Sequence, residues 1–239
     1  MSWFIRSENL MSIGFRIYTQ IRRPPLSLAD AFLPYSTSNI ADNMGRMFCM
    51  DAAIKPLRED SKLVGIAFTV KTRPGDNLLV HKALDMALPG DVIVVDAQGD
   101  MTNSILGEIM VRYALKKGLR GFVIDGAVRD WAGIKQLDLP VFAKGASPRG
   151  PYKDGPGEIN VPISCGGVAV YPGDIIVGDA DGVVVIPAKE AEEVLRRTSE
   201  LAAREQAIFQ QVEEGTWDRR WVDEILQQKG CEILETVWS

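Results

Sequence analysis

The sequence predicts a layered α/β fold with a largely parallel central sheet. Short apolar runs of strand length alternate with amphipathic helical stretches from residue 65 to residue 143, and turns rich in Gly and Pro separate them. The chain has 239 residues, of which 46% are hydrophobic, so it is long enough to bury a complete core. Right-handed crossovers between parallel strands then place the helices on the faces of the sheet.

Caps, periodicity and turns define the elements of this first part. Ser36 and Asp76 can each cap a helix, and Gly118 can end one. Gln98-Gly99-Asp100 is typical of a loop. The predicted elements are helices over 36–47, 76–88, 104–117 and 131–137, and strands over 65–72, 91–97, 121–125 and 139–143.

The remainder is β-rich and then helical. Residues 146–157 contain so many Pro and Gly that no regular element is predicted there. Strands are predicted within 161–170 and 174–186, with a hairpin-like turn at 179–182. A long amphipathic helix over 188–212 and a short one over 217–228 complete the chain. The long helix has two interpretations, because its apolar stripe suits either the cover of the sheet or packing between subunits.

One segment of the chain nearly repeats. Residues 89–99, PGDVIVVDAQG, match residues 172–182, PGDIIVGDADG, at eight of eleven positions. The flanking sequences do not match, so two similar turn-plus-strand entries explain the similarity better than a duplication. We therefore predict an N-terminal extension over 1–27, a single α/β domain over 28–187 and a C-terminal helical segment over 188–239.

The low numbers of His and Cys limit the kinds of catalytic and metal sites that the chain can form. A single His excludes a two-His zinc site within one chain, and three scattered Cys form no CxxC pair. A formal net charge of −5 argues against nucleic-acid binding through a broad basic surface. Carboxylates, Arg and backbone amides must then carry most of any enzymatic chemistry. We interpret His81 as a packed or hydrogen-bonded helix residue and Cys165 as a small core residue.

The sequence also predicts where the protein works. No run of about 18 apolar residues exists, so no membrane span is predicted. The N-terminus lacks the apolar core of a secretory signal, and we expect an irregular start that folds onto the domain. Together with the unpaired Cys, these features favour a reducing cytoplasm.

Glu108, Arg129 and Asp130 are the strongest candidates for a functional site. One predicted strand leads into the helix that begins near Gly107, and the next strand ends just before Arg129. Ligands of open α/β sheets bind beyond the carboxyl ends of strands, and helix starts favour anions. Two carboxylates suit Mg²⁺ or Mn²⁺, and Arg suits a carboxylate or an enolate. The alternative is that Arg129 and Asp130 cap a helix or pair locally at the surface.

These residues carry a family resemblance. Gly107-Glu108 and the stretch GFVIDGAVRD, residues 121–130, resemble the class II pyruvate aldolases acting on 4-hydroxy-4-methyl-2-oxoglutarate and 4-carboxy-4-hydroxy-2-oxoadipate. In that family an acidic residue is followed, after twenty intervening residues, by Arg-Asp, as Glu108 is followed here by Arg129-Asp130. The family also contains the regulator of ribonuclease E activity. The acidic residue is Glu here, whereas the characterised aldolases usually have Asp.

The resemblance implies both a fold and a reaction. The fold would be an α/β sandwich of the swivelling-domain type, with a central mixed sheet and a long C-terminal helix. The reaction would be a metal-dependent retro-aldol cleavage of 4-hydroxy-2-oxo di- or tricarboxylic acids to pyruvate, with oxaloacetate decarboxylation as a side activity. The expected partner is a small 2-oxo acid, not nucleic acid or membrane. A homotrimer or hexamer with the site at a subunit interface is also implied.

The resemblance also assigns roles to individual residues. Asp130 would bind Mg²⁺ or Mn²⁺ directly, Glu108 would hold the metal through water, and Glu205 is the candidate acidic ligand from a neighbouring subunit. Arg129 and the metal would bind the 2-oxo acid end of the substrate. The amides of Ile109 and Met110, beside Gly107, would hold the substrate carboxylate. Such a site stabilises the pyruvate enolate left when the C3–C4 bond breaks.

Two other functions fit the same sequence. One is a non-catalytic protein-binding module like the ribonuclease regulator, which the retained acidic and Arg-Asp motif argues against. The other is an enzyme on this scaffold with a different 2-oxo acid or a sugar acid as its substrate.

Overall fold

The computed structural model describes residues 13–238, so the prediction for the first twelve residues lies outside the described part. The chain divides into two compact units, one ending at Thr198 and the other beginning at Ser199. None of the described helices is long and apolar enough to cross a membrane.

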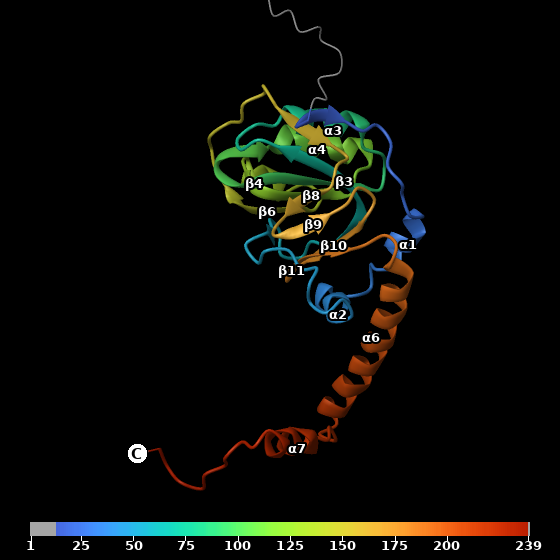
Figure 1. Ribbon diagram of the computed structural model, residues 1–239, viewed down its shortest axis with the longest axis vertical. Coiled ribbons are helices and arrows are strands. Elements are labelled where there is room, and N and C mark those ends of the chain that lie inside the picture. The colour runs from blue at the N-terminus through green and yellow to red at the C-terminus, as the bar shows by residue number, and fades with distance from the viewer. Residues whose placement is uncertain (1–12, 239) are drawn as a thin grey trace, which may run out of the picture. The chain divides into compact units, whose positions relative to one another are not determined.

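A mixed sheet forms the centre of the first unit (Figure 1). Its middle is parallel and runs in the order β3 (Leu63–Thr72), β4 (Asp91–Leu106), β5 (Gly121–Val128) and β6 (Val141–Ala146). At one edge, β2 (Lys55–Pro56) pairs antiparallel with β6. On the other side of the sheet, β3 pairs antiparallel with both β7 (Gly157–Ile159) and β10 (Ile175–Asp179). Beyond these, β1 (Phe15–Ile17) pairs parallel with β7, and β11 (Gly182–Ile186) pairs antiparallel with β10. The mixed α/β architecture is thereby confirmed, with a parallel centre of four strands and one further parallel pair, β1 with β7, at the edge.

Alternating side chains of these strands build two cores, one on each face of the sheet. Ile93 packs in the core under α3 (Leu78–Met86) and α4 (Glu108–Lys117). Its neighbour Val94 packs in the core under the hairpin of β8 (Ile163–Cys165) and β9 (Val168–Val170). Figure 1 shows the two helices and the hairpin on opposite sides of the sheet. Cys165 is fully buried in the second core, as predicted.

A third core involves the helices near the ends of this unit. Residues of α1 (Leu26–Asp30), α2 (Thr37–Asp42) and the start of α6 (Ala191–Glu213) pack with β3, β10 and β11. Ser36 caps α2 as predicted, because its hydroxyl accepts the N–H of Asn39 at 3.2 Å. The remainder of α6 and α7 (Arg220–Gln228) belong to the second unit, so a long C-terminal helix is confirmed.

The structure corrects the predicted boundary between β4 and α4. Residues 98–100, predicted as a loop, belong to β4, where Gln98 and Gly99 have φ of 57° and 71° and the pairing with β5 shifts register. Residues 104–106, predicted as helix, continue the strand. The N–H and hydroxyl of Ser104 both donate to the carbonyl of Arg149, at 2.8 and 2.9 Å. These bonds hold the backbone extended, and α4 begins only after Gly107.

The two similar segments form the same local structure. Gly90 and Gly173 have φ of 96° and 98°, which a residue with a Cβ rarely adopts. Asp91 and Asp174 each accept the backbone N–H of the residue three positions earlier, at 2.9 and 2.8 Å. The similarity therefore reflects two equal turns that each start a strand.

The strands that follow these turns share one neighbour, because β4 and β10 both pair with β3. Their sequences differ at Gly178, which corresponds to Val95 of β4. A Cβ at Gly178 would lie 2.7 Å from the ring of Phe142. Glycine is thus required where β10 passes the aromatic ring.

Candidate functional site

A cavity of about 230 Å³ opens where β4 leads into α4 and β5 leads into α5 (Trp131–Ile134). Five of the residues predicted for the site line it, namely Gly107, Ile109, Met110, Arg129 and Asp130. Its other walls come from the start of α3 and from the irregular segment 147–156. The structure therefore brings together the two loops that the sequence predicts to meet.

Asp130 is held at the rim of this cavity by an unusual backbone conformation. Its φ and ψ are 58° and 34°, in the left-handed region that Asp tolerates better than most residues. Its Oδ2 accepts the N–H of Glu108 at 3.1 Å. A Cβ at Gly107 would lie 2.8 Å from the same oxygen. Gly107 is therefore needed for the close approach of the Asp130 carboxylate to the start of α4.

The guanidinium of Arg129 lies between two glycines. A Cβ at Gly107 would lie 3.1 Å from Nε, and one at Gly150 would lie 3.2 Å from Nη1. Among residues 13–238 its one ion pair joins Nε to the Asp130 Oδ2 at 3.7 Å. Both side chains are nearly half exposed, at 44% and 45%. Most of the guanidinium donors of Arg129 thus remain available to an anionic ligand.

The amides at the start of α4 differ in their availability. The N–H of Glu108 donates to Asp130, and the N–H of Met110 donates to the carbonyl of Gly107 at 3.0 Å. The N–H of Ile109 has no acceptor in the part of the chain that the structure describes. The Ile109 amide is therefore the free donor at this helix start, whereas the Met110 amide is already engaged.

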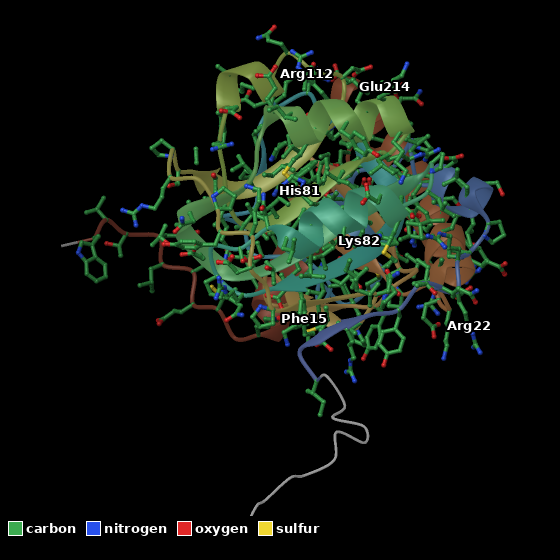
Figure 2. The ribbon with its side chains drawn as sticks, turned by 90° about the horizontal axis from the view of Figure 1, so that it is seen from above. Phe15, Arg22, His81, Lys82, Arg112 and Glu214 are labelled. Atoms are coloured by element: carbon green, nitrogen blue, oxygen red, sulfur yellow. The ribbon has the colours of Figure 1, made fainter. Side chains whose placement is uncertain are left out.

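The carboxylate of Glu108 does not line the cavity. Its Oε1 accepts Nε and Nη2 of Arg112 at 2.7 and 2.6 Å. Its Oε2 rests on α5, where a Cβ at Gly133 would lie only 1.9 Å away. Arg112, labelled in Figure 2 on α4, and the bare Cα of Gly133 thus hold the Glu108 carboxylate beside the rim of the cavity.

The acidic side chains at the cavity suit a hydrated divalent metal better than one held by protein ligands alone. No group of three or more His, Cys, Asp and Glu that could hold a metal occurs among the described side chains. Asp130 is the predicted ligand whose carboxylate reaches the cavity. Mg²⁺ usually keeps several waters and binds one or two carboxylates, so Asp130 fits a hydrated ion. Glu205 lies in the second unit, and its contribution from a neighbouring copy stays a prediction.

Sequence reasoning did not place two basic residues, His81 and Lys153, in the cavity wall. His81 is exposed on α3 and lines the cavity, so its interpretation as a packed residue is wrong. Lys153 enters from the segment in which no element was predicted. Partial burial, and then the charge of Lys153, lower the pKa of His81, whereas Asp85 raises it. No local pattern marks either residue, because their proximity depends on the path of the loop.

The family model described as RraA-like, Aldolase/RraA, matches residues 37–185 of this chain. The chain belongs to the RraA-like family. It is 47% identical over 176 residues to a protein of Halalkalibacterium halodurans provisionally named 4-hydroxy-4-methyl-2-oxoglutarate aldolase. The matched region covers 74% of this chain and 84% of that protein. The family resemblance predicted from residues 107–130 is thus confirmed.

Two solved structures share the fold of this chain. An uncharacterized protein of Pseudomonas syringae matches with a TM-score of 0.74 and 27% identity, over 82% of this chain and 97% of that one. Streptomyces coelicolor RraAS2, an unusual member of the RNase ES inhibitor RraA family, matches with a TM-score of 0.72 and 28% identity, over 78% and 98% of the two chains. The family therefore joins names of aldolases with names of ribonuclease inhibitors.

Proposed function

We propose that this RraA-like protein is a divalent-metal-dependent lyase. It cleaves 4-hydroxy-2-oxo acids to pyruvate by a retro-aldol reaction and decarboxylates oxaloacetate as a side reaction. The observation that carries the proposal is the convergence of the Arg129 guanidinium, the Asp130 carboxylate and the free Ile109 amide on one cavity. The provisional aldolase name of the 47% identical relative supports it.

The residues divide the chemistry among them. Asp130 would hold Mg²⁺ or Mn²⁺ directly and Glu108 would hold it through water. Glu205 of a neighbouring subunit would be a further acidic ligand, and the metal would supply Lewis acidity. Arg129 donates hydrogen bonds to the 2-oxo end of the substrate and stabilises the negative charge that develops as the C3–C4 bond breaks. The Ile109 amide donates to the substrate carboxylate at the positive end of α4.

The proposed function also implies an oligomeric state and a cellular compartment. A homotrimer or hexamer would bring Glu205 of the partner subunit to the site, and the protein would work in the cytoplasm. Membership of the RraA-like family supports the oligomer.

Pyruvate release tests the proposed activity. The protein is incubated with oxaloacetate and with 4-hydroxy-2-oxoglutarate in the presence of Mg²⁺, and then with EDTA. We expect pyruvate from both substrates with the metal and none after chelation. If neither compound nor any other 4-hydroxy-2-oxo acid yields metal-dependent pyruvate, the protein is not this lyase.

A non-catalytic regulator is the second candidate, because the chain also resembles RraAS2 in fold. The cavity with its unpaired Arg129 donors favours the enzyme. Calorimetry with Mg²⁺ and Mn²⁺, combined with a pull-down using a purified ribonuclease E, separates the two functions. Binding of the ribonuclease without metal binding would reverse the ranking.

A further inference from the structure

A second cavity, of about 390 Å³, lies between the segment that follows β1 and the chain on either side of the β8–β9 hairpin. It shares no lining residue with the cavity at Arg129 and Asp130. Its wall from residues 16–22 lies outside the region 37–185 that the family model matches. The volume falls within the range of small-molecule sites. The second cavity is therefore a place for a ligand that the proposed bond cleavage does not involve.

The wall of the second cavity is basic. Arg16 and Arg22 line it, and none of the described residues that line it is acidic. The guanidinium of Arg16 is engaged, because its Nε donates to Oε1 of Glu158 at 2.6 Å. Arg22 forms no ion pair with any residue in the range 13–238. In a chain of formal net charge −5, a free guanidinium at a cavity favours an anionic ligand.

Two contacts fix the backbone that carries Arg22. A Cβ at Gly173 would collide with the carbonyl oxygen of Arg22, so the chain passes directly against the turn before β10. The next residue, Arg23, donates from Nε and Nη2 to the carboxylate of Asp91, at 3.2 and 2.8 Å. Figure 2 shows Arg22 at the surface of the molecule. An exposed guanidinium is thus held on a well-anchored stretch of chain.

Two tyrosine rings supply flat surfaces in the same cavity. Tyr18 and Tyr171 line it and are 49% and 56% exposed. The guanidinium of Arg16 lies over the ring of Tyr18, 5.6 Å from its centroid, whereas no Arg or Lys in the described chain lies over the ring of Tyr171. The N–H of Tyr171 donates to Oδ2 of Asp174 at 2.8 Å, which fixes the chain beneath this ring. An exposed ring in a cavity suits a planar ligand that stacks on it.

A buried amide supplies a directional contact. Asn160 lines the cavity although it is only 7% exposed. Its Nδ2 donates to the carbonyl of Tyr18 at 2.8 Å, and its backbone N–H donates to the carbonyl of Thr69 at 2.9 Å. Its Oδ1 has no hydrogen-bond partner among residues 13–238. Because the bond to Tyr18 fixes the orientation of the amide, Oδ1 is an acceptor that lacks a donor.

We propose that the second cavity binds a nucleoside monophosphate whose base carries an amino group. The base stacks on Tyr171, its amino group donates to Oδ1 of Asn160, and its phosphate accepts hydrogen bonds from Arg22. A carboxylic acid without a ring would leave the tyrosine and the amide unused. The inference does not depend on the proposed lyase activity.

Calorimetry with the full-length protein compares ligands that differ by one group. Adenosine 5′-monophosphate (AMP) is titrated beside adenosine, which lacks the phosphate, and purine riboside 5′-monophosphate, which lacks only the amino group. EDTA is present, so that no metal at Asp130 binds phosphate. We expect both analogues to bind about tenfold more weakly than AMP, because each lacks one hydrogen-bonding group. If AMP, cytidine monophosphate and guanosine monophosphate all fail to bind, the proposal is wrong.

Variants locate the bound nucleotide. Arg22→Gln should weaken the binding of AMP about tenfold and leave the binding of adenosine unchanged, because it removes the partner of the phosphate. Tyr171→Leu should weaken the binding of both ligands about tenfold, because the base loses its stacking surface. Arg204→Gln, which changes an exposed Arg of α6 outside the cavity, is the matched control.

The remaining outcomes would each count against the proposal. Loss of AMP binding in Arg129→Ala but not in Arg22→Gln would place the nucleotide in the other cavity. Equal losses in Arg22→Gln and Arg204→Gln would show a general effect of charge. Tighter binding of the trinucleotide ApApA than of AMP would make the cavity part of an RNA-binding surface.

Two further results remain informative. Equal affinities for AMP and purine riboside 5′-monophosphate would overturn the role of Asn160. If Tyr171→Leu fails to fold, Arg22→Gln and the series of ligands still decide. Absence of pyruvate release by the wild-type protein would refute the proposed lyase and leave these titrations intact.

Discussion

Charged residues gather at the carboxyl ends of the central strands in two regions that differ in burial. In the first region, Lys71, Asp96 and Asp125 are register partners across β3, β4 and β5. Lys144 of β6 completes this row, with Nζ 2.8 Å from the Asp125 Oδ1. Asp125 also accepts the N–H of Gly166 at 2.8 Å. The second region begins four residues later, with Arg129 and Asp130.

The comparison shows that burial and pairing decide whether a charged side chain stabilises the fold or is available to a ligand. The side chains of Asp125 and Lys144 are 9% and 21% exposed and are bonded within the protein. Arg129 and Asp130 are nearly half exposed, lie beside a cavity and form only a loose pair. Charges that are paired in the interior hold the strands together, whereas charges with free donors at a cavity are available to a ligand.

Removal of Arg129 has the largest expected effect. Arg129→Ala should lower kcat for pyruvate release about 100- to 1000-fold, because one donor to the developing enolate is lost. Its midpoint of thermal unfolding should change little, since the side chain is half exposed. Steady-state kinetics and calorimetry measure both quantities, with Arg197→Ala as a surface control. A loss of stability as large as the one expected for Lys144→Met, described below, would contradict the distinction between the two regions.

Removal of Lys144 should have the opposite signature. Lys144→Met leaves the carboxylate of Asp125 buried without its cation, which costs about 3 kcal/mol in the free energy of unfolding. Activity per folded molecule should persist. Urea unfolding gives the free energy, and Lys116→Met on the exposed face of α4 is the control. Lost activity at unchanged stability would place Lys144 in the functional region instead.

The pH dependence of stability sharpens the comparison further. Burial, and to a lesser degree the charge of Asp125, raise the pKa of Asp96 above its ordinary value. The folded protein therefore binds more protons at this group than the unfolded chain, and Asp96 lowers stability as pH rises from its unfolded pKa through its folded pKa. Asp96→Asn removes this effect. The stability of the variant relative to wild type should rise over that interval in thermal melts, and a constant difference would contradict the buried charge.

The smallest expected effect concerns the contact between Glu108 and Arg112. Arg112→Ala frees the Glu108 carboxylate from an exposed helix pair worth about 0.5 kcal/mol. Mg²⁺ affinity should therefore rise about twofold by calorimetry. Lys116→Met again serves as the control, and weaker binding by Arg112→Ala would show that the pair supports the metal site.

Short-range patterns in the sequence predict the strands, helices and the meeting of two loops. The spacing of Glu108 from Arg129-Asp130 predicts their proximity, and Gly107 and Gly133 show in the structure why it is possible. Periodicity cannot predict β1 and β7, because each is short and their pairing joins residues 142 positions apart, such as Arg16 and Glu158. The bonds from the N–H groups of Asp154 and Gly155 to the buried carboxylate of Asp76 cannot be predicted for the same reason, because they join residues nearly 80 positions apart.

The similarity of strands β4 and β10 raises the question of what assigns each segment to its place beside β3. Both segments are complementary to β3, and one belongs parallel to it while the other belongs antiparallel. They are nevertheless not interchangeable, because a Val at position 178 would meet the ring of Phe142. A single hydrogen atom in place of a side chain thus reserves the place beside Phe142 for β10, and Gly178→Val would destabilise the native packing there.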